Sequence, residues 1–284
     1  MKYLVLFNPL AHSNTGKKKA ETLKEKLTDG TVEFADLTSE PYTEYISALG
    51  SDDKIVVCGG DGTLNRFINK IEGMKIPNEI LYYPTGSGND FYKDVCSDET
   101  GETIVSINKY ITDLPLVTVK GKTCRFLNGI GYGIDGYCCE IGDIQRQKSD
   151  KPVNYASIAI KGLLFNYKPT NAVITVDGKN YEYKNVWLAP TMNGKYYGGG
   201  MIPTPAQNRL GDGTLSVMVY HCKSKLKALS VFPSIFKGEH VKKTKVVEVM
   251  TGKDITVKFD RPVALQIDGE TVLNVSECNM RAVK

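Results

Sequence analysis

Short strand-like runs alternate with helical patterns along roughly the first 115 residues of the chain. Strands are predicted at residues 3–7, 31–37, 54–58 and 80–83. Helices are predicted between or after them, at residues 17–27, 42–49, 64–71 and 103–109, with apolar side chains on one face. Strands that alternate with helices form parallel sheets with covered faces. We therefore expect an α/β domain built on a parallel sheet.

Beyond Pro115 the pattern changes to apolar and polar residues in alternation. Strands are predicted at residues 172–176, 215–220, 246–250, 255–259 and 264–267, so this half is expected to be mainly β. Two apolar stretches, residues 155–165 and 225–236, interrupt the alternation. Each has the composition of a helix or of a lid over the sheet, and both are candidate walls for an apolar ligand.

Composition and charge narrow the class of protein only slightly. The 284 residues carry a formal charge of +4, which permits anionic ligands or membrane surfaces and gives no indication of nucleic acid. Seven cysteines form no CxxC pair, which favours a reducing, cytoplasmic compartment. No apolar run approaches the length that spans a bilayer, so we expect no transmembrane segment and at most transient, peripheral membrane contact.

A glycine-rich turn follows the strand predicted at residues 54–58. It consists of Gly59, Gly60, Asp61, Gly62 and Thr63. Glycines let the backbone approach phosphate oxygens, and the following helix would offer its N-terminal N–H groups and positive dipole end. Asp61 would be repelled by bare phosphate, so its presence suggests a Mg²⁺ ion or a catalytic base.

The alternative is an ordinary tight turn, because glycine and aspartate are common turn formers. A second turn makes the phosphate-binding interpretation stronger. It follows the next predicted strand at the matching sheet edge, and it contains Gly86, Ser87, Gly88 and Asn89. Two such turns at one edge could hold opposite sides of a nucleotide.

Together the two motifs resemble the diacylglycerol-kinase-like lipid kinases, a family that includes bacterial diacylglycerol kinases and sphingosine kinases. Further signatures stand in the family's order: Asn8-Pro9, residues 59–63, residues 84–91, Asn128 with Gly133 and Asp135, residues 198–206, and residues 268–270. The resemblance covers the whole chain. It implies a phosphofructokinase-like nucleotide-binding domain at residues 1–116 and a β-sandwich lipid-substrate domain at residues 117–274, with residues 275–284 returning to the first domain.

The resemblance also implies roles for individual residues. ATP would bind at Asn8, Pro9, Thr38, Gly59, Gly60, Asp61, Gly62, Thr63, Gly86, Ser87, Gly88 and Asn89. Asp268 would accept the proton of the lipid hydroxyl, with Glu270 beside it. By itself, Asp268-Gly269 also has the sequence of a plain hairpin turn, and both interpretations hold if that turn directs its carboxylate into the site.

Metal ligands are expected at two places. Asp61 would share a Mg²⁺ ion with ATP, and a second, structural Mg²⁺ would be held by Asp212 with Arg209 and Thr214. The alternative for the second place is a solvated Asp-Gly turn. The first loop, residues 10–17, departs from the family pattern because it is longer than usual, and Ser87 replaces a threonine while preserving the hydroxyl.

Two other functions stay open at this point. A NAD kinase shares the glycine-rich turn, and a catalytically inactive regulator could bind nucleotide or lipid without turnover.

The GxGxxG sequence at residues 131–136 has no dinucleotide-binding context and predicts a bend in the second domain. Lysines around residues 226–236 suit either a solvated face or an anionic membrane. The expected partner is a lipid substrate at a membrane surface; the identity of the lipid and a homodimer are left open.

Overall fold

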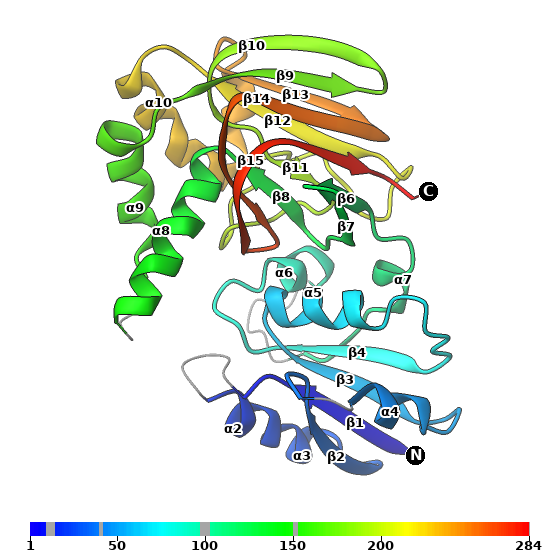
Figure 1. Cartoon of the computed structure of the whole chain (residues 1–284). Helices are drawn as coiled ribbons and strands as arrows, with labels where there is room; N and C mark the ends of the chain where they lie inside the picture. The colour runs from blue at the N-terminus through cyan, green and yellow to red at the C-terminus, as the bar shows by residue number, and fades with distance from the viewer. Residues whose placement is uncertain (10–14, 40–41, 97–102, 150–152, 284) are drawn as a thin grey trace. The chain divides into compact units, whose positions relative to one another are not determined.

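The chain forms two compact units in the computed structural model, Met1–Thr112 and Asp113–Lys284. The structure describes residues 1–9, 15–39, 42–96, 103–149 and 153–283 (Figure 1). No helix of these ranges has both the length and the apolar character needed to cross a bilayer.

The first unit is built on a five-stranded sheet. Its strands are β1 (Lys2–Phe7), β2 (Thr31–Asp36), β3 (Lys54–Gly59), β4 (Glu79–Pro84) and β5 (Val105–Ser106), in the order β2-β1-β3-β4-β5. The first four are parallel, and β5 runs antiparallel to β4. Five consecutive residues of β1 and five of β3 are buried, as expected for central strands covered on both faces. The predicted α/β domain with a parallel sheet is confirmed.

Six helices accompany this sheet in the described part of the unit. They are α2 (Gly16–Glu21), α3 (Leu23–Lys26), α4 (Tyr42–Ser47), α5 (Asp61–Lys70), α6 (Asp90–Val95) and α7 (Asn108–Ile111). The helix predicted at residues 103–109 is wrong, because Val105 and Ser106 pair with β4 and only α7 is helical. Helix α6, at the second turn, was not predicted. Helix α5 begins at Asp61, three residues before the predicted start, because Gly60 already occupies the N-cap position.

The second unit is dominated by a ten-stranded sheet (Figure 1). Its strands are β6 (Leu116–Val119), β7 (Lys122–Arg125), β8 (Gly129–Tyr132), β9 (Thr170–Val176), β10 (Lys179–Leu188), β11 (Thr191–Met192), β12 (Leu215–His221), β13 (Val247–Gly252), β14 (Asp254–Ile267) and β15 (Glu270–Arg281). One end of β14 pairs with β9 and the other with β8, with a register shift between Lys258 and Val263. Such a shift lets one strand serve two layers around a shared core. The predicted β-rich, sandwich-like domain is confirmed.

Helical segments cover a second apolar core in this unit, around the fully buried Trp187. They are α8 (Ile134–Lys148), α9 (Tyr155–Lys161), the π-helix η1 (Gly162–Asn166), α10 (Lys225–Val231) and the 3₁₀ helices η2 (Phe232–Lys237) and η3 (Glu239–Lys242). Instead of a simple bend, the stretch at 131–136 runs from β8 into α8. Gly133 makes the junction at φ 110°, where a Cβ would lie 2.5 Å from the Trp187 carbonyl oxygen.

The end of the chain differs from the expectation that residues 275–284 return to the first unit. Strand β15 pairs with β14 and β6, and Val275, Cys278 and Met280 are buried in the core of the second unit. The apolar side chains of β15 are used by this sheet, so the described residues up to 283 stay with it. The unit boundary falls at residue 112, four residues before the predicted one.

Candidate active site

Four neighbouring parallel strands of the first unit end at one edge of their sheet. Asn8 follows β1, Thr38 follows β2 by two residues, Gly60 follows β3 and Gly86 follows β4 by two residues. The backbone N–H of Leu37 donates to the Phe7 carbonyl oxygen at 2.8 Å, which joins the first two loops. At about 4.8 Å between strands, the four ends span about 14 Å. The edge therefore brings together the positions expected to bind ATP, in the place where α/β sheets bind ligands.

The two glycine-rich turns are in direct contact. The Thr85 N–H donates to the Gly59 carbonyl oxygen at 2.9 Å. A Cβ on Gly86 would lie 2.6 Å from the Gly60 Cα, which is too close for any side chain at position 86. Both positions need glycine because the two backbones meet there. The sequence anticipated two turns at one edge, and the structure brings them together as one surface of backbone groups.

Asp61 fastens the first turn to the second. Its Oδ2 accepts from the Asp90 N–H at 2.9 Å, and its Oδ1 accepts from the Phe91 N–H at 2.8 Å. A carboxylate in this position caps helix α6 and complements the positive end of its dipole. From the sequence, the presence of a carboxylate at position 61 was explained only by a Mg²⁺ ion or a catalytic base. The structure adds a structural role, because this carboxylate sets where α6 begins.

Asn89 holds the second turn in shape. It adopts left-handed backbone angles, with φ 52°. Its side-chain Oδ1 accepts from the Gly86 N–H at 3.0 Å and its Nδ2 donates to the Gly86 carbonyl oxygen at 2.9 Å. Asparagine tolerates this backbone region better than most residues. The amide thus closes the turn on itself and leaves Ser87 exposed between Gly86 and Gly88.

The remaining predicted positions of this unit are placed as follows. Thr38 bonds to Asp36, with its hydroxyl 2.6 Å from the Asp36 Oδ1. Thr63 is 8% exposed and its side chain packs over Gly59. Asn8 and Pro9 are partly buried, and residues 10–14 of the first loop lie outside the described residues. Burial raises the pKa of the nearby Cys58 thiol to about 11, although a hydrogen bond with Thr85 opposes the shift, so this thiol is neutral at pH 7.

In the second unit Asp268 lies in a two-residue hairpin turn between β14 and β15. Asp268 and Gly269 both have positive φ, 46° and 96°, the combination that matches the twist of a tight hairpin. Strand pairing continues directly across the turn, from Ile267 to Glu270. The hairpin expected from the Asp-Gly sequence is present. Glu270 is exposed at the start of β15.

Three consecutive backbone N–H groups hold the Asp268 carboxylate. Its Oδ2 accepts from Leu127 at 2.5 Å, and its Oδ1 accepts from Asn128 at 2.8 Å and Gly129 at 3.1 Å. These donors belong to the segment that leads into β8. The turn therefore does not leave its carboxylate in solvent, and the carboxylate has one defined orientation.

The segment that holds Asp268 is itself fixed by two side chains. Arg209 donates from Nη1 to the Leu127 carbonyl oxygen at 3.1 Å and from Nη2 to the Asn128 Oδ1 at 2.9 Å. Asn193 donates from Nδ2 to the Leu127 carbonyl oxygen at 2.9 Å. The sequence interpretation named Arg209 only beside a metal and missed Asn193. No signal in the sequence marks Asn193, because its burial, with 8% of the residue exposed, is a property of the fold.

Gln266 and Asp135 support the same turn from the other side. The Gln266 side chain accepts from the Gly269 N–H at 2.6 Å and donates to the Asp135 Oδ2 at 2.9 Å. Burial raises the pKa of Asp135 from its ordinary 3.8 to about 6, and the hydrogen bond from Gln266 opposes that shift. The Asp135 carboxyl, with its pKa raised in this way, lies next to the turn that carries Asp268.

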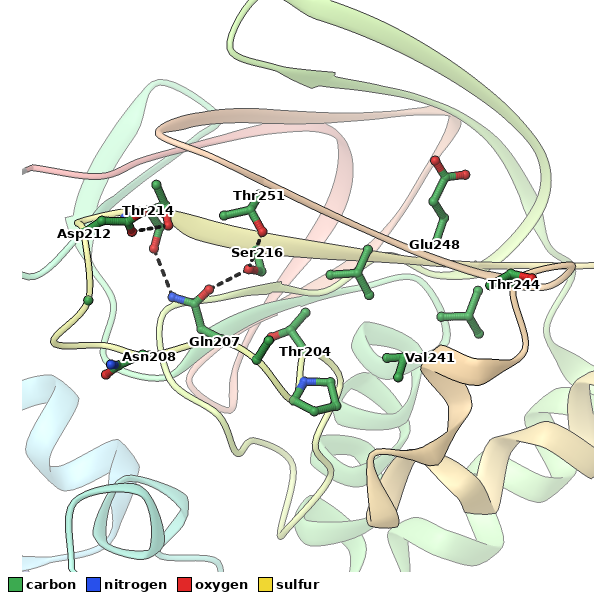
Figure 2. A pocket seen from close by; sticks show the side chains of 15 residues that line it. Thr204, Gln207, Asn208, Asp212, Thr214, Ser216, Val241, Thr244, Glu248 and Thr251 are labelled. Carbon is green, nitrogen blue, oxygen red and sulfur yellow. Dashed lines mark hydrogen bonds between the residues drawn. The ribbon is translucent and has the colours of Figure 1, made fainter.

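The loop that carries Arg209 also lines a pocket of about 940 Å³ within the second unit (Figure 2). Gln207 accepts from the Ser216 hydroxyl and donates to the Thr214 carbonyl oxygen, and Ser216 bonds to Thr251. The apolar part of the pocket wall is formed by Val241, Val247 and Val249. The stretches at 155–165 and 225–236, offered by the sequence as walls for an apolar ligand, do not line this pocket.

The second expected metal position is a closed turn. The Asp212 Oδ1 accepts from both the backbone N–H and the hydroxyl of Thr214, which lowers the pKa of the exposed Asp212. The Arg209 guanidinium is directed to Leu127 and Asn128. Among the described residues no group of three or more His, Cys, Asp or Glu side chains could hold a metal. The structure therefore supports the Asp-Gly turn and adds no further ligand for a structural Mg²⁺.

Family models match both units. The model of the diacylglycerol kinase catalytic domain matches residues 2–119. The model of the YegS C-terminal NAD kinase beta sandwich-like domain matches residues 128–280, which is more than half of the chain.

Curated relatives and solved structures match over nearly the full length. The chain is 23% identical to the "Putative lipid kinase YtlR" of Bacillus subtilis, over 94% of this chain and 93% of that protein. It is 24% identical to a diacylglycerol kinase of Mycobacterium tuberculosis, over 95% of this chain and 88% of that protein. The crystal structure of a "putative diacylglycerol kinase" from Bacillus anthracis shares the fold, with a TM-score of 0.65, 20% identity and coverage of 99% and 91%. The chain belongs to the diacylglycerol-kinase-like lipid kinase family.

Proposed function

We propose that the protein transfers the γ-phosphoryl group of ATP to the hydroxyl of a membrane lipid, with diacylglycerol as the favoured acceptor. The observation that carries the proposal is the joined pair of glycine turns at the edge of four parallel strands. Family membership gives the reaction class. The first unit is proposed as the nucleotide-binding domain and the second as the lipid-substrate domain.

In the first unit, backbone groups would bind the triphosphate. The N-terminal turn of α5, after its cap Gly60, directs backbone N–H groups and a positive dipole end toward the sheet edge. The turn around Ser87 adds an exposed hydroxyl. Asn8, Pro9 and Thr38 follow the neighbouring strands and are proposed to contact the rest of the nucleotide.

Mg²⁺ fits the first unit only together with ATP. The Asp61 carboxylate lies in the first turn of α5, and Mg²⁺ is commonly held by one or two carboxylates plus substrate phosphates. Asp61 would hold the ion, which neutralises charge on the phosphates. The Mg²⁺ position at Asp212, Arg209 and Thr214 stays a prediction.

In the second unit, Asp268 is proposed to orient the acceptor hydroxyl and to take its proton. A bond forms between the acceptor oxygen and the γ-phosphorus, and the bond from that phosphorus to the β,γ-bridging oxygen breaks, with ADP as the leaving group. Because phosphoryl transfer relies mainly on positioning, a carboxylate fixed by three N–H donors suits the task. Glu270, exposed beside the turn, is proposed to assist at the acceptor side.

Labelled ATP and a panel of acceptors test the proposal. Purified protein with Mg²⁺ should transfer label to diacylglycerol or a related lipid alcohol. Formation of NADP from NAD in place of labelled lipid would identify a NAD kinase. ATP binding without transfer to any acceptor would identify a catalytically inactive regulator. Either result would overturn the proposal.

We also propose that the enzyme works in the cytoplasm and visits the membrane transiently, because its acceptor would reside there. Flotation of the protein with membranes in a cell fractionation, reversed by high salt, is the expected result. Protein that stays entirely in the supernatant at low salt would contradict this part.

A further inference from the structure

Two large apolar side chains of the second unit stand out from the described surface. Phe165 of η1 is 75% exposed and Leu226 of α10 is 73% exposed, the highest values among the large apolar residues of the described ranges. Ile160 of α9 and Phe236 of η2 are exposed to a lesser degree. Scattered apolar residues are normal on a surface, whereas exposed ones gathered in one place mark an interaction site.

The segments that carry them lie side by side. The Lys225 Nζ donates to the Leu164 carbonyl oxygen at 2.9 Å, which ties the residue before Leu226 to the residue before Phe165. Helices α9 and α10 are drawn next to each other in Figure 1, in agreement with this bond. Phe165 and Leu226 therefore belong to one surface, called here the α9–α10 face, formed by residues 153–168 and 221–238.

The charged side chains on the two segments of the α9–α10 face are all basic, and Glu182 of β10 borders them in a hollow that Lys223 and Lys227 also line. The two segments contain the lysines 161, 168, 223, 225, 227 and 237 and no aspartate or glutamate in the sequence. All six lysines are exposed. Apolar side chains surrounded by lysines are what a protein uses to insert into the interface of an anionic bilayer.

The charge also decides between a bilayer and a second copy of the chain. A two-fold dimer through the α9–α10 face would place the same six lysines of both copies against each other. Like charges facing across an interface are unfavourable, whereas anionic lipid head groups attract them. An anionic bilayer is therefore a better binding partner for this face than a second copy of the chain.

The α9–α10 face connects closely to the turn that carries Asp268. Gly162, three residues before Phe165, packs against the first turn of α8, where a Cβ would lie 3.1 Å from Tyr137 and 3.2 Å from Ile134. That turn of α8 carries Asp135, which bonds to Gln266, and Gln266 in turn bonds to Gly269. A bilayer bound at this face would therefore lie one packed layer away from the proposed acceptor carboxylate.

We propose that the α9–α10 face docks on anionic membranes, with Phe165 and Leu226 inserted among the lipids and the lysines on the head groups. This inference rests on the proposed lipid kinase function only for the reason why the protein would bind a membrane. Binding to a bilayer is a property of the surface itself, so it can be measured without ATP or turnover.

Sedimentation with vesicles tests the proposal. Wild-type protein should bind vesicles of phosphatidylcholine with 30% phosphatidylglycerol and should bind pure phosphatidylcholine at least tenfold more weakly. The double variant Phe165→Ala, Leu226→Ala should lose about tenfold or more in binding to the anionic vesicles. The double variant Lys161→Glu, Lys227→Glu should lose about fivefold or more per lysine. Leu273→Ala, which removes an apolar side chain 47% exposed on β15, is the matched control and should bind as wild type does.

Three outcomes would overturn the docking proposal: no vesicle binding by the wild type, equal binding by all variants, or a dimer that Phe165→Ala, Leu226→Ala dissociates. Turnover is measured separately with short-chain diacylglycerol dispersed in detergent. There the apolar double variant should keep wild-type activity. Vesicle binding without any phosphoryl transfer would contradict the proposed kinase function and would still support the docking proposal.

Discussion

The proposed nucleotide site of the first unit and the proposed acceptor carboxylate of the second unit are built in opposite ways. In the first unit, side chains hold backbone: Asp61 and Asn89 fix two turns whose glycine backbones meet. In the second unit, backbone holds a side chain: three N–H groups fix the Asp268 carboxylate. A triphosphate is bound well by many N–H donors, whereas a proton is taken by one oriented carboxylate.

This difference predicts two kinds of sensitivity. The first unit should be damaged by any atom added at its glycines, because the site is the backbone itself. The second unit should be damaged by losing one charge or the groups that position it.

Gly86→Ala should have the largest effect on ATP binding. Its Cβ would lie 2.6 Å from the Gly60 Cα, and backbone on both sides cannot move aside as a flexible side chain could. We expect ATP to bind about 100-fold more weakly, since overpacking costs about 1–3 kcal/mol and the turn is the site. Titration with a non-hydrolysable ATP analogue measures this. Gly50→Ala is the control, because there the nearest atom would be the Asp53 Oδ2 at 3.4 Å. Equal affinities of the two variants would refute the close approach as a requirement.

Asp61→Asn should destabilise the first unit by about 2 kcal/mol. The amide would turn an NH₂ group toward one of the two N–H donors of α6 and would remove the charge that complements its dipole. Urea unfolding of the full chain measures the loss. Asp52→Asn, an exposed carboxylate in a turn, is the control. If both variants unfold at the same urea concentration, Asp61 does not cap α6.

Asp135→Asn should change how stability depends on pH. In the folded protein the pKa of Asp135 is raised from 3.8 to about 6. The group therefore stabilises the folded wild type below pH 4, and this contribution to the free energy of unfolding is lost as the pH rises through about 6. Asparagine keeps an acceptor for Gln266 and cannot ionise. The variant should be more stable than wild type by about 3 kcal/mol at pH 7, and the difference should shrink toward pH 4. Unfolding curves from pH 4 to 8 measure it; a difference independent of pH would contradict the shift.

Arg209→Met should reduce kcat about tenfold and leave the KM for ATP unchanged. The variant loses both bonds to the segment that orients Asp268, while the proposed nucleotide site lies in the other unit. Arg209→Lys, which can restore one of the two bonds, should recover part of the rate. Arg281→Met, on an exposed side chain, is the control. A rise in KM with kcat intact would show that Arg209 does not position Asp268.

The hydrophobic pattern was enough to predict the α/β class of the first unit and the β-rich class of the second, because burial imposes these patterns directly. The short apolar run at residues 54–58 is typical of a central strand, and the alternation in segments such as residues 172–176 is typical of a sheet with two different faces. The pattern failed where pairing overrides local preference. Val105 and Ser106 lie in a helix-like segment, and β4 recruits them as a strand.

The site was predictable only as far as its motifs are local. The two glycine turns each follow a strand, so their meeting at one edge could be inferred from the sequence. The contacts of Asn193 and Arg209 with Leu127 join residues 66 and 82 positions apart. Such contacts depend on how the β-rich unit folds over itself, which short-range patterns do not contain. The capping role of Asp61 was missed for the same reason, because α6 was not predicted.

A paired measurement on Asp268→Asn tests whether ATP binding and phosphoryl transfer depend on different units of the chain. Asparagine tolerates the left-handed backbone of this turn, where φ is 46°, so the hairpin should persist, although the new NH₂ group would face at least one of the three N–H donors that hold the carboxylate. Binding of an ATP analogue and transfer of labelled phosphate to diacylglycerol are measured on the same preparation. We predict ATP affinity within about threefold of wild type and a transfer rate lower by about 1,000-fold, within the range for loss of a general base. A variant that transfers phosphate at the wild-type rate, or that loses ATP binding together with transfer, would contradict the division of labour between the two units.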